Sequence, residues 1–253
     1  MANVCQIGSG LIGSTMALDL AKEHKVYLAD LDQSSLNKVK NKNPNIDVKK
    51  LDIRDVPKLE NFISKADIVL TAVPGNLGFK LVKDIINNKK NVVDISFSKE
   101  DLMSLDNLAR DNNVTAVFDA GVAPGIPNYI LGHIGKKFTV NSFEYFVGGL
   151  PKHPEPPYNY KAPFSPSDVL EEYIRPARCR IDGNIKVLPA LSDIVQLQYD
   201  KIGKLEAFNT DGFSVGSSGS YNGNSNTYVA WQWAAGGAAP VSYTHLRAHE
   251  TGR

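Results

Sequence analysis

Six short apolar segments recur at similar intervals along the first half of the chain, and each is rich in Val and Ile. They are mostly continuous apolar runs rather than alternations of apolar and polar residues. Continuous runs of this length are typical of strands that are buried on both faces of a sheet. The segments are Asn3–Ile7, Lys25–Asp30, Ile46–Leu51, Ile68–Val73, Asn91–Ile95 and Val114–Phe118.

Segments with helical signals lie between these predicted strands. Leu11–Lys22 places its apolar side chains near one helical face, and Asp55 is suited to cap a helix over residues 56–64. Ser98, followed three residues later by Asp101, predicts the start of another helix. Strand and helix therefore alternate, and right-handed crossovers predict an α/β fold with a doubly wound parallel sheet of the Rossmann type.

The pattern changes after Gly135. Val140–Val147 alternates like an antiparallel strand, and Leu150–Pro166 contains six prolines, which predicts a loop. A short helix is predicted at Asp168–Tyr173, and strands are predicted at Asn184–Leu188, Ile194–Tyr199 and Leu205–Phe208. We therefore expect a Rossmann domain over residues 1–138 and a partial α+β substrate domain over residues 139–212.

Composition sets the last part of the chain apart. Residues 212–253 contain three charged side chains, Arg247, Glu250 and Arg253, whereas 22% of the whole chain is charged. Val241–Arg253 resembles translated adapter sequence from the ends of assembled reads. We expect residues 213–253 to be disordered or artefactual and the reading frame to be truncated. The alternative is a C-terminus specific to one lineage.

Charge and cysteine content exclude several classes of protein. The formal net charge is +1, so no basic surface for nucleic acid is predicted. No apolar run approaches the length of a membrane span, and the N-terminus lacks the pattern of a signal peptide. The two cysteines, Cys5 and Cys179, lie far apart and match no metal-ligand spacing. These features favour a cytoplasmic protein without a bound metal.

A glycine-rich motif follows the first predicted strand. Gly8-Ser9-Gly10-Leu11-Ile12-Gly13 is G-x-G-x-x-G, and the second strand ends in Asp30, where dinucleotide-binding folds carry an acid for the adenosine ribose. A carboxylate there accepts hydrogen bonds from the ribose hydroxyls and repels a 2′-phosphate, which favours NAD over NADP. The residues expected to contact the cofactor in this motif are Gly8, Gly10, Leu11, Ile12, Gly13 and Asp30. The alternative is a glycine-rich turn that binds nothing.

Three further strand ends carry candidate site residues. Asp52 and Ile53 follow the third strand and either contact adenine or form a turn. Ala72, Val73 and Pro74 follow the fourth strand and are expected to line the nicotinamide half of the crevice, because ligands bind at the carboxyl ends of such strands. Asp119 follows the sixth strand and either orients the substrate or satisfies backbone groups in a turn.

Several of these motifs occur together in an order that resembles the saccharopine dehydrogenase family. They are Ala72–Gly75, Phe118–Asn128, Gly148–Pro151, Asn159–Lys161 and Phe164–Pro166. The resemblance implies reversible hydride transfer between a nicotinamide and an amine-bearing carbon of an amino acid. It also implies that Ser96 and Phe97, at the end of the fifth strand, border the nicotinamide and the substrate. Gly148, Gly149 and Lys161 would face the same substrate cleft from the second domain, and the full-length protein would be a homodimer.

Gly13, Asp30 and Ala123 depart from the NADP-using saccharopine reductases and point toward the NAD-using, lysine 6-dehydrogenase-like branch. We therefore expect an NAD(P)-dependent oxidoreductase that acts on a CH–NH or CH–NH₂ group of lysine or saccharopine. Asp119 and Lys161 are the catalytic candidates, although a lysine in a proline-rich loop is equally expected to be solvated. The alternatives are a non-catalytic NAD-binding fragment or sensor and a dehydrogenase of alcohols.

Overall fold

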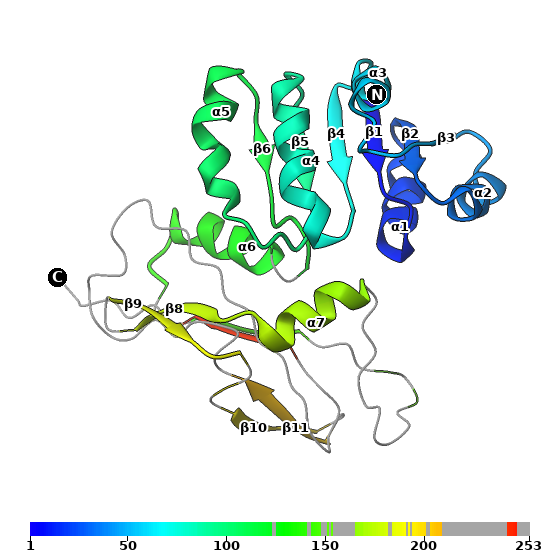
Figure 1. The fold of residues 1–253 in the computed structure, drawn as a ribbon. Coiled ribbons are helices and arrows are strands. Elements are labelled where there is room, and N and C mark those ends of the chain that lie inside the picture. Colours follow the sequence, from blue (N-terminus) through cyan, green and yellow to red (C-terminus); the bar gives the residue numbers. More distant parts are fainter. Residues whose placement is uncertain are drawn as a thin grey trace. The chain divides into compact units, whose positions relative to one another are not determined.

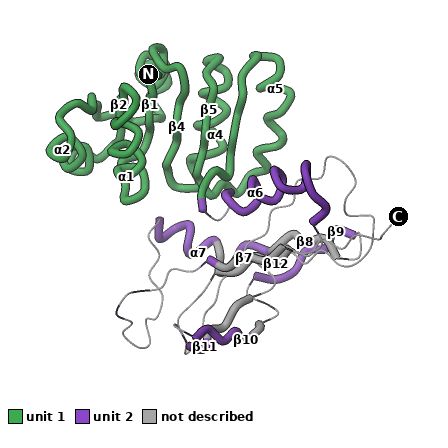
Figure 2. Tube along the Cα trace, turned by 180° about the vertical axis from the view of Figure 1, so that it is seen from behind, with its two compact units in different colours: residues 1–121 green, residues 122–253 purple. Residues whose placement is uncertain are grey.

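The computed structural model describes the chain except residues 123–124, 141–142, 148–150, 152, 154–164, 182–183, 191, 193, 201–202, 209–241 and 247–253. The chain divides into two compact units, Met1–Gly121 and Val122–Arg253 (Figure 2). The first unit ends earlier than the expected residue 138, because the parallel sheet is completed before Gly121 and the next helix belongs to the second unit.

The first unit is built on a six-stranded parallel sheet with the strand order β3-β2-β1-β4-β5-β6 (Figure 1). The order reverses between β1 and β4, which is the topological switch point of doubly wound folds. The fold class predicted from the apolar runs is therefore confirmed, and each run forms a strand. The strands are β1 (Asn3–Ile7), β2 (Lys25–Asp30), β3 (Asp47–Lys50), β4 (Ile68–Thr71), β5 (Val92–Asp94) and β6 (Ala116–Val117).

Helices connect the strands, and aspartate side chains begin three of them. Asp32 caps α2, Asp55 caps α3 as predicted, and Asp101 caps the short 3₁₀ helix η1 by accepting the backbone N–H of Met103 at 3.0 Å. The cap of η1 is therefore Asp101 and not the predicted Ser98. The helices of this unit are α1 (Leu11–Leu20), α2 (Gln33–Lys42), α3 (Val56–Ile63), α4 (Gly75–Asn87), η1 (Leu102–Leu105) and α5 (Asp106–Asp111).

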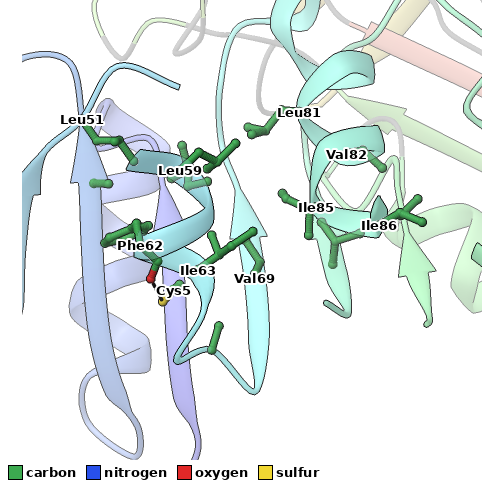
Figure 3. Close-up of a cluster of buried hydrophobic side chains, with 14 of the residues drawn as sticks. Cys5, Leu51, Leu59, Phe62, Ile63, Val69, Leu81, Val82, Ile85 and Ile86 are labelled. Atoms are coloured by element: carbon green, nitrogen blue, oxygen red, sulfur yellow. Dashed lines mark hydrogen bonds between the residues drawn. The ribbon is translucent and has the colours of Figure 1, made fainter. Parts of the chain in front are cut away.

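Both faces of the sheet are covered by apolar side chains. On one face, residues of α3, α4 and α5 pack against the strands, and Leu59, Ile63 and Ile85 are completely buried there (Figure 3). On the other face, Leu36 and Val39 of α2 pack on the strands together with α1. Burial on both faces explains why the strands are continuous apolar runs rather than alternating ones.

Cys5 belongs to the first of these clusters. Its side chain is completely buried and its thiol donates to the backbone oxygen of Phe62 at 3.4 Å (Figure 3). Burial raises the pKa of the Cys5 thiol to about 11, so the thiolate that would react is disfavoured. Cys5 is therefore a packing residue.

The described residues of the second unit form two helices and several antiparallel strand pairs. Strand β8 pairs with β9 and β10 pairs with β11, both as antiparallel neighbours, and β7 pairs with β12. Strand β12 lies in the segment 213–253, for which we expected no structure; it contains Tyr243 and Thr244, residue types that are common in strands. The elements are α6 (Ile126–Gly135), β7 (Phe143–Val147), α7 (Pro166–Ile174), β8 (Ala177–Ile181), β9 (Asn184–Leu188), β10 (Ile194–Tyr199), β11 (Gly203–Phe208) and β12 (Ser242–Leu246).

Candidate functional site

The glycine motif forms the turn between β1 and α1, and two of its glycines are required by close backbone contacts. Gly8 has a φ of +103°, and a Cβ atom there would lie 2.2 Å from the backbone oxygen of Ala72. A Cβ atom on Gly13 would lie 2.3 Å from the backbone oxygen of Gly8. Any side chain at either position would push β1, the end of β4 and α1 apart, so the turn depends on both glycines.

Gly10 has a different role from the other two glycines. A Cβ atom at Gly10 would meet no atom within 4 Å, so the backbone at this point faces open space. Helix α1 begins at the next residue, and among the described residues no side chain caps it. The first N–H groups of α1 and its partial positive charge are therefore available to an anion such as a pyrophosphate. Leu11 and Ile12, the other two expected contacts, are exposed beside this helix start.

Asp30 lies at the end of β2, where its carboxylate connects the glycine turn to the next helix. One carboxylate oxygen accepts the backbone N–H of Ser9 at 2.6 Å, and the other accepts the backbone N–H of Asp32 at 2.8 Å. Each oxygen can accept more than one hydrogen bond, so a ribose hydroxyl remains a possible further partner. The structure thus brings Asp30 and the glycine turn together, as their spacing predicts.

Gln6 is a residue of this site that the motif did not reveal. It lies on β1 and is completely buried, and its side-chain amide donates to the backbone oxygens of Gly8 at 3.0 Å and Gly13 at 2.6 Å. One amide group therefore joins the first and last glycines of the turn. Its Oε1 atom has no hydrogen-bond partner within the described parts of the chain. A buried polar residue inside an otherwise apolar strand was the signal that could have identified it.

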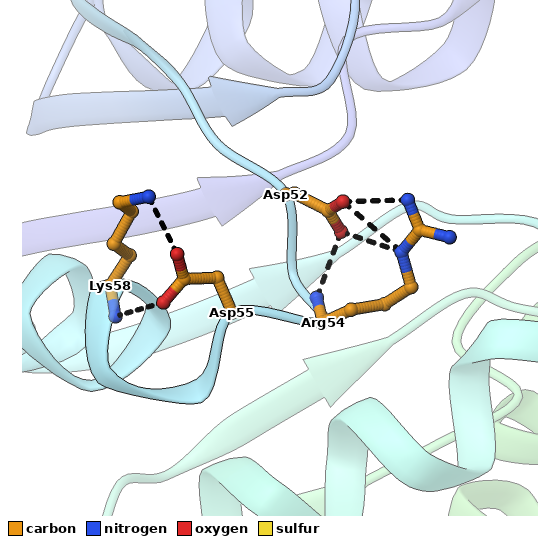
Figure 4. A network of polar contacts seen from close by, with 4 residues as sticks. All are labelled: Asp52, Arg54, Asp55 and Lys58. Atoms are coloured by element: carbon orange, nitrogen blue, oxygen red, sulfur yellow. Dashed lines mark hydrogen bonds and ion pairs between the residues drawn. The ribbon is translucent and has the colours of Figure 1, made fainter.

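Asp52 and Ile53 follow β3, and the contacts of Asp52 correspond to the turn alternative. The Arg54 guanidinium donates to both carboxylate oxygens of Asp52, with a shortest distance of 2.6 Å, and the Arg54 backbone N–H donates to the same carboxylate at 3.0 Å (Figure 4). The Arg54 side chain lowers the pKa of Asp52 to about 2. Ile53 packs partly buried against the apolar cluster of the first sheet face. The predicted adenine contact of these two residues stays a prediction.

A buried acid lies between the ends of β4 and β5, close to two of the predicted site segments. Asp94 is completely buried, and the hydroxyls of Thr71 and Ser96 both donate to its Oδ1 atom, the latter at 2.7 Å. Its Oδ2 atom has no partner among the described residues. Burial raises the pKa of Asp94 above the ordinary value, and the two hydroxyl donors oppose this shift only in part.

This acid explains how Ser96 is held. Ser96 was expected to border the nicotinamide and substrate, and the structure shows its side chain buried and directed at Asp94. Gly78 of α4 packs against it, since a Cβ atom on Gly78 would lie 2.7 Å from the Ser96 Cβ. The Ala72–Pro74 segment follows directly after Thr71, so Asp94 joins the ends of the two strands from which the predicted nicotinamide wall comes.

Asp119 follows β6 and has a φ of +51°, in the left-handed region that residues with a side chain rarely adopt. Aspartate tolerates this conformation better than most residues, which fits the turn alternative, and the role of Asp119 in catalysis stays a prediction. Phe97 lies after β5 and is partly buried. Lys161, Gly148, Gly149 and Ala123 lie outside the described residues.

No group of three or more His, Cys, Asp or Glu side chains in the described part of the chain is arranged to hold a metal ion. None of the described helices is long and apolar enough to cross a membrane.

The strand order, the glycine turn and the acid at the end of β2 define a dinucleotide-binding domain of the Rossmann class. Comparison with known families supplies the particular family. The saccharopine dehydrogenase NADP binding domain matches residues 4–117, and the saccharopine dehydrogenase C-terminal domain matches residues 121–227. The chain belongs to the saccharopine dehydrogenase family, which confirms the resemblance seen in its motifs. The second match begins before and ends after the expected bounds of 139–212.

Individual relatives agree with this assignment. The chain is 29% identical over 142 residues to a saccharopine dehydrogenase [NADP(+), L-glutamate-forming] of Pyricularia oryzae, covering 53% of this chain and 32% of that protein. It is 23% identical over 192 residues to the mitochondrial alpha-aminoadipic semialdehyde synthase of Rattus norvegicus, covering 72% of this chain and 21% of that protein. The chain thus spans about a third or less of the length of these relatives.

A solved structure supports the fold. The apo saccharopine dehydrogenase (L-Glu forming) of Saccharomyces cerevisiae matches with a TM-score of 0.64 at 21% identity, covering 83% of this chain and 50% of that one. The family match establishes a nicotinamide dinucleotide as the type of cofactor. Because the matched domain is named for NADP, it favours NADP, whereas Asp30 had led us to expect NAD.

We expect Gln6→Leu to lower the free energy of unfolding by about 1–2 kcal/mol, because two buried carbonyls lose a hydrogen-bond donor. We also expect it to weaken dinucleotide binding, because the amide joins Gly8 and Gly13. Chemical denaturation and binding titration measure the two effects. The control is Gln196→Leu at an exposed position of β10, which should change neither. Unchanged stability and affinity in Gln6→Leu would contradict the role assigned to Gln6.

Asp94 predicts a dependence of stability on pH. Because its pKa is raised in the folded state, the folded chain holds the proton more strongly than the unfolded chain. The contribution of Asp94 to stability is therefore largest below the ordinary aspartate pKa and decreases as the pH rises through the folded-state pKa. Asp94→Asn abolishes this decrease.

The stability of Asp94→Asn relative to the wild type should therefore increase as the pH rises above the ordinary aspartate pKa, as measured by denaturation at each pH. Asn107→Ala, which changes an exposed side chain of α5 that does not titrate, provides the control for the pH dependence. Parallel pH curves for Asp94→Asn and the wild type would show that Asp94 does not hold a proton more strongly in the folded state.

Proposed function

We propose that this chain is part of an oxidoreductase that transfers a hydride between a nicotinamide dinucleotide and an amine-bearing carbon of an amino acid. The observation that carries the proposal is the joined arrangement of the glycine turn, the uncapped start of α1 and the Asp30 carboxylate. Membership of the saccharopine dehydrogenase family supports the amine-bearing carbon as the reacting centre. The names of the relatives support lysine metabolism as the context.

The cofactor supplies the hydride chemistry, and the residues of the chain bind and orient it. The N-terminus of α1 would hold the pyrophosphate, with the backbone at Gly10 allowing its close approach. Asp30 would accept a hydrogen bond from the adenosine ribose. The segment 72–74 would line the nicotinamide end, and Asp94 would keep the neighbouring strand ends together through Thr71 and Ser96. The catalytic roles of Asp119 and Lys161 remain predictions.

Two forms of the cofactor are candidates. NADP is favoured by the match to the family's NADP binding domain. NAD is favoured by Asp30, because a carboxylate at the end of β2 repels a 2′-phosphate and accepts a ribose hydroxyl. A substrate of the lysine or saccharopine type fits either form.

The remaining expectations stay proposals or lose support. The comparisons give no support to the alternative of a non-catalytic NAD sensor. A homodimer and a cytoplasmic location stay proposals, and the similar proteins from rat and mouse are named as mitochondrial. A small amino-acid substrate, with no nucleic-acid partner, is part of the same proposal.

Asp30→Asn tests the position of the ribose. Loss of the negative charge removes both the repulsion of a 2′-phosphate and the strongest acceptor for the ribose hydroxyls. The ratio of the dissociation constant for NADP to that for NAD should therefore fall by roughly fivefold, as measured by titration with each dinucleotide. Asp32→Asn removes the same charge two residues away, from a side chain that caps α2, and should change the ratio less. An unchanged ratio in Asp30→Asn would refute the ribose assignment.

A substrate screen tests the reaction itself. With NAD or NADP present, lysine or saccharopine should reduce the cofactor, which the absorbance of the reduced nicotinamide reports, and simple secondary alcohols should not. Turnover of alcohols alone would contradict the proposal. Tight dinucleotide binding without turnover of any of these amines would restore the sensor alternative.

A further inference from the structure

The family match favours NADP, whereas Asp30 favours NAD. The two cofactors differ at the adenosine 2′-oxygen, which we place beside Asp30. A 2′-phosphate bound there needs a cation close to the Asp30 carboxylate. The segment that follows β2, Leu31-Asp32-Gln33, contains no basic residue. A cation beside the 2′-phosphate would therefore have to come from another element of the chain if NADP binds.

Strand β3 brings a lysine to this position. In the parallel pairing of β2 and β3, Lys50 is the residue in register with Asp30, and the backbone N–H of Leu51 donates to the Asp30 backbone oxygen at 2.9 Å. Residues in register on neighbouring strands lie about 4.8 Å apart. Both residues end their strands at the carboxyl edge of the sheet, where doubly wound folds bind their ligands.

The alternation of side chains places Lys50 on the same face of the sheet as Asp30. Val48 packs in the cluster under α2, together with Leu28 of β2. Lys49 lies on the opposite face, with its ammonium over the Phe62 ring of α3. Side chains alternate along a strand, so Lys50 shares the face of Val48, and Asp30 shares the face of Leu28.

The contacts of the neighbouring cations distinguish Lys50 from them. Lys25 pairs with Asp47, Arg54 pairs with Asp52, and Lys58 pairs with Asp55. Lys50 is exposed. Within the described parts of the chain its ammonium forms no ion pair with a carboxylate and no hydrogen bond. Its ammonium is therefore available to a ligand at the edge of the sheet next to Asp30.

We propose that Lys50 is the cation that binds the 2′-phosphate of NADP in this chain, and thereby offsets the repulsion from Asp30. The assignment rests on the proposed binding of a dinucleotide at the glycine turn. It makes Lys50 a residue that determines cofactor specificity, and it predicts that the chain binds NADP in spite of the acid at the end of β2.

The experiment compares Lys50→Gln with Lys49→Gln, which removes the same charge from the adjacent position on the opposite face. Each variant and the wild type are titrated with NADP, NAD, adenosine 2′,5′-bisphosphate and adenosine 5′-phosphate. We expect Lys50→Gln to weaken binding of NADP and of the bisphosphate by roughly fivefold, and to change the affinity for NAD and the monophosphate by less than about twofold. Lys49→Gln should leave the ratio of the NADP and NAD affinities unchanged.

The difference between wild type and Lys50→Gln should also decrease as salt is added, because the contact is between exposed charges. Thermal unfolding of each variant checks that the fold is retained, which the exposure of Lys50 favours. An unchanged ratio in Lys50→Gln, an equal change in Lys49→Gln, or a wild-type chain that binds NAD but not NADP would each overturn the assignment. A wild-type chain that binds neither dinucleotide would overturn the proposed function as well.

Discussion

The close approach of three backbone segments at the end of β1 is the constraint on which the site depends. Gly8 lies against the end of β4 at Ala72, and Gly13 lies against Gly8, at distances that leave no room for a Cβ atom. This contact fixes where α1 begins, and therefore where its unpaired N–H groups are directed. Gln6 stabilises the same contact, because its buried side-chain amide donates to the backbone oxygens of both glycines.

The carboxylates at the carboxyl edge of the sheet have different functions because their surroundings differ. Asp52 is half-buried and paired with Arg54, which makes it part of a turn. Asp94 is buried, and no cation in the described part of the chain pairs with it. It holds two strand ends together through hydroxyl donors, and its burial raises its pKa. Asp30 is partly buried, and each of its carboxylate oxygens accepts one backbone N–H group. Each oxygen can accept a further hydrogen bond from a ligand.

The disagreement about the cofactor shows why one residue of a motif is a limited guide to specificity. The acid at the end of β2 favours NAD when it is considered alone, whereas the family match favours NADP. The energy of a 2′-phosphate depends on all charges near it, including any supplied by the neighbouring strand. Pairing of β2 with β3 puts Lys50 in register with Asp30. An acid at the end of β2 and binding of NADP are therefore compatible in the same chain.

The sequence by itself determined the fold class of the first unit, the glycine turn and Asp30, because apolar runs, glycine spacing and strand length are local properties. It also identified the family, since several specific motifs occur in order. Only the tertiary structure decided that Asp52 forms a turn, that Asp101 rather than Ser98 begins η1, and that Gln6 and Asp94 belong to the site. Most of these contacts join residues close in the chain and depend on the backbone geometry of the turns, whereas the contact of Thr71 with Asp94 joins two neighbouring strands. Strand register, which pairs Asp30 with Lys50, is likewise set by packing of the whole sheet and not by any local pattern.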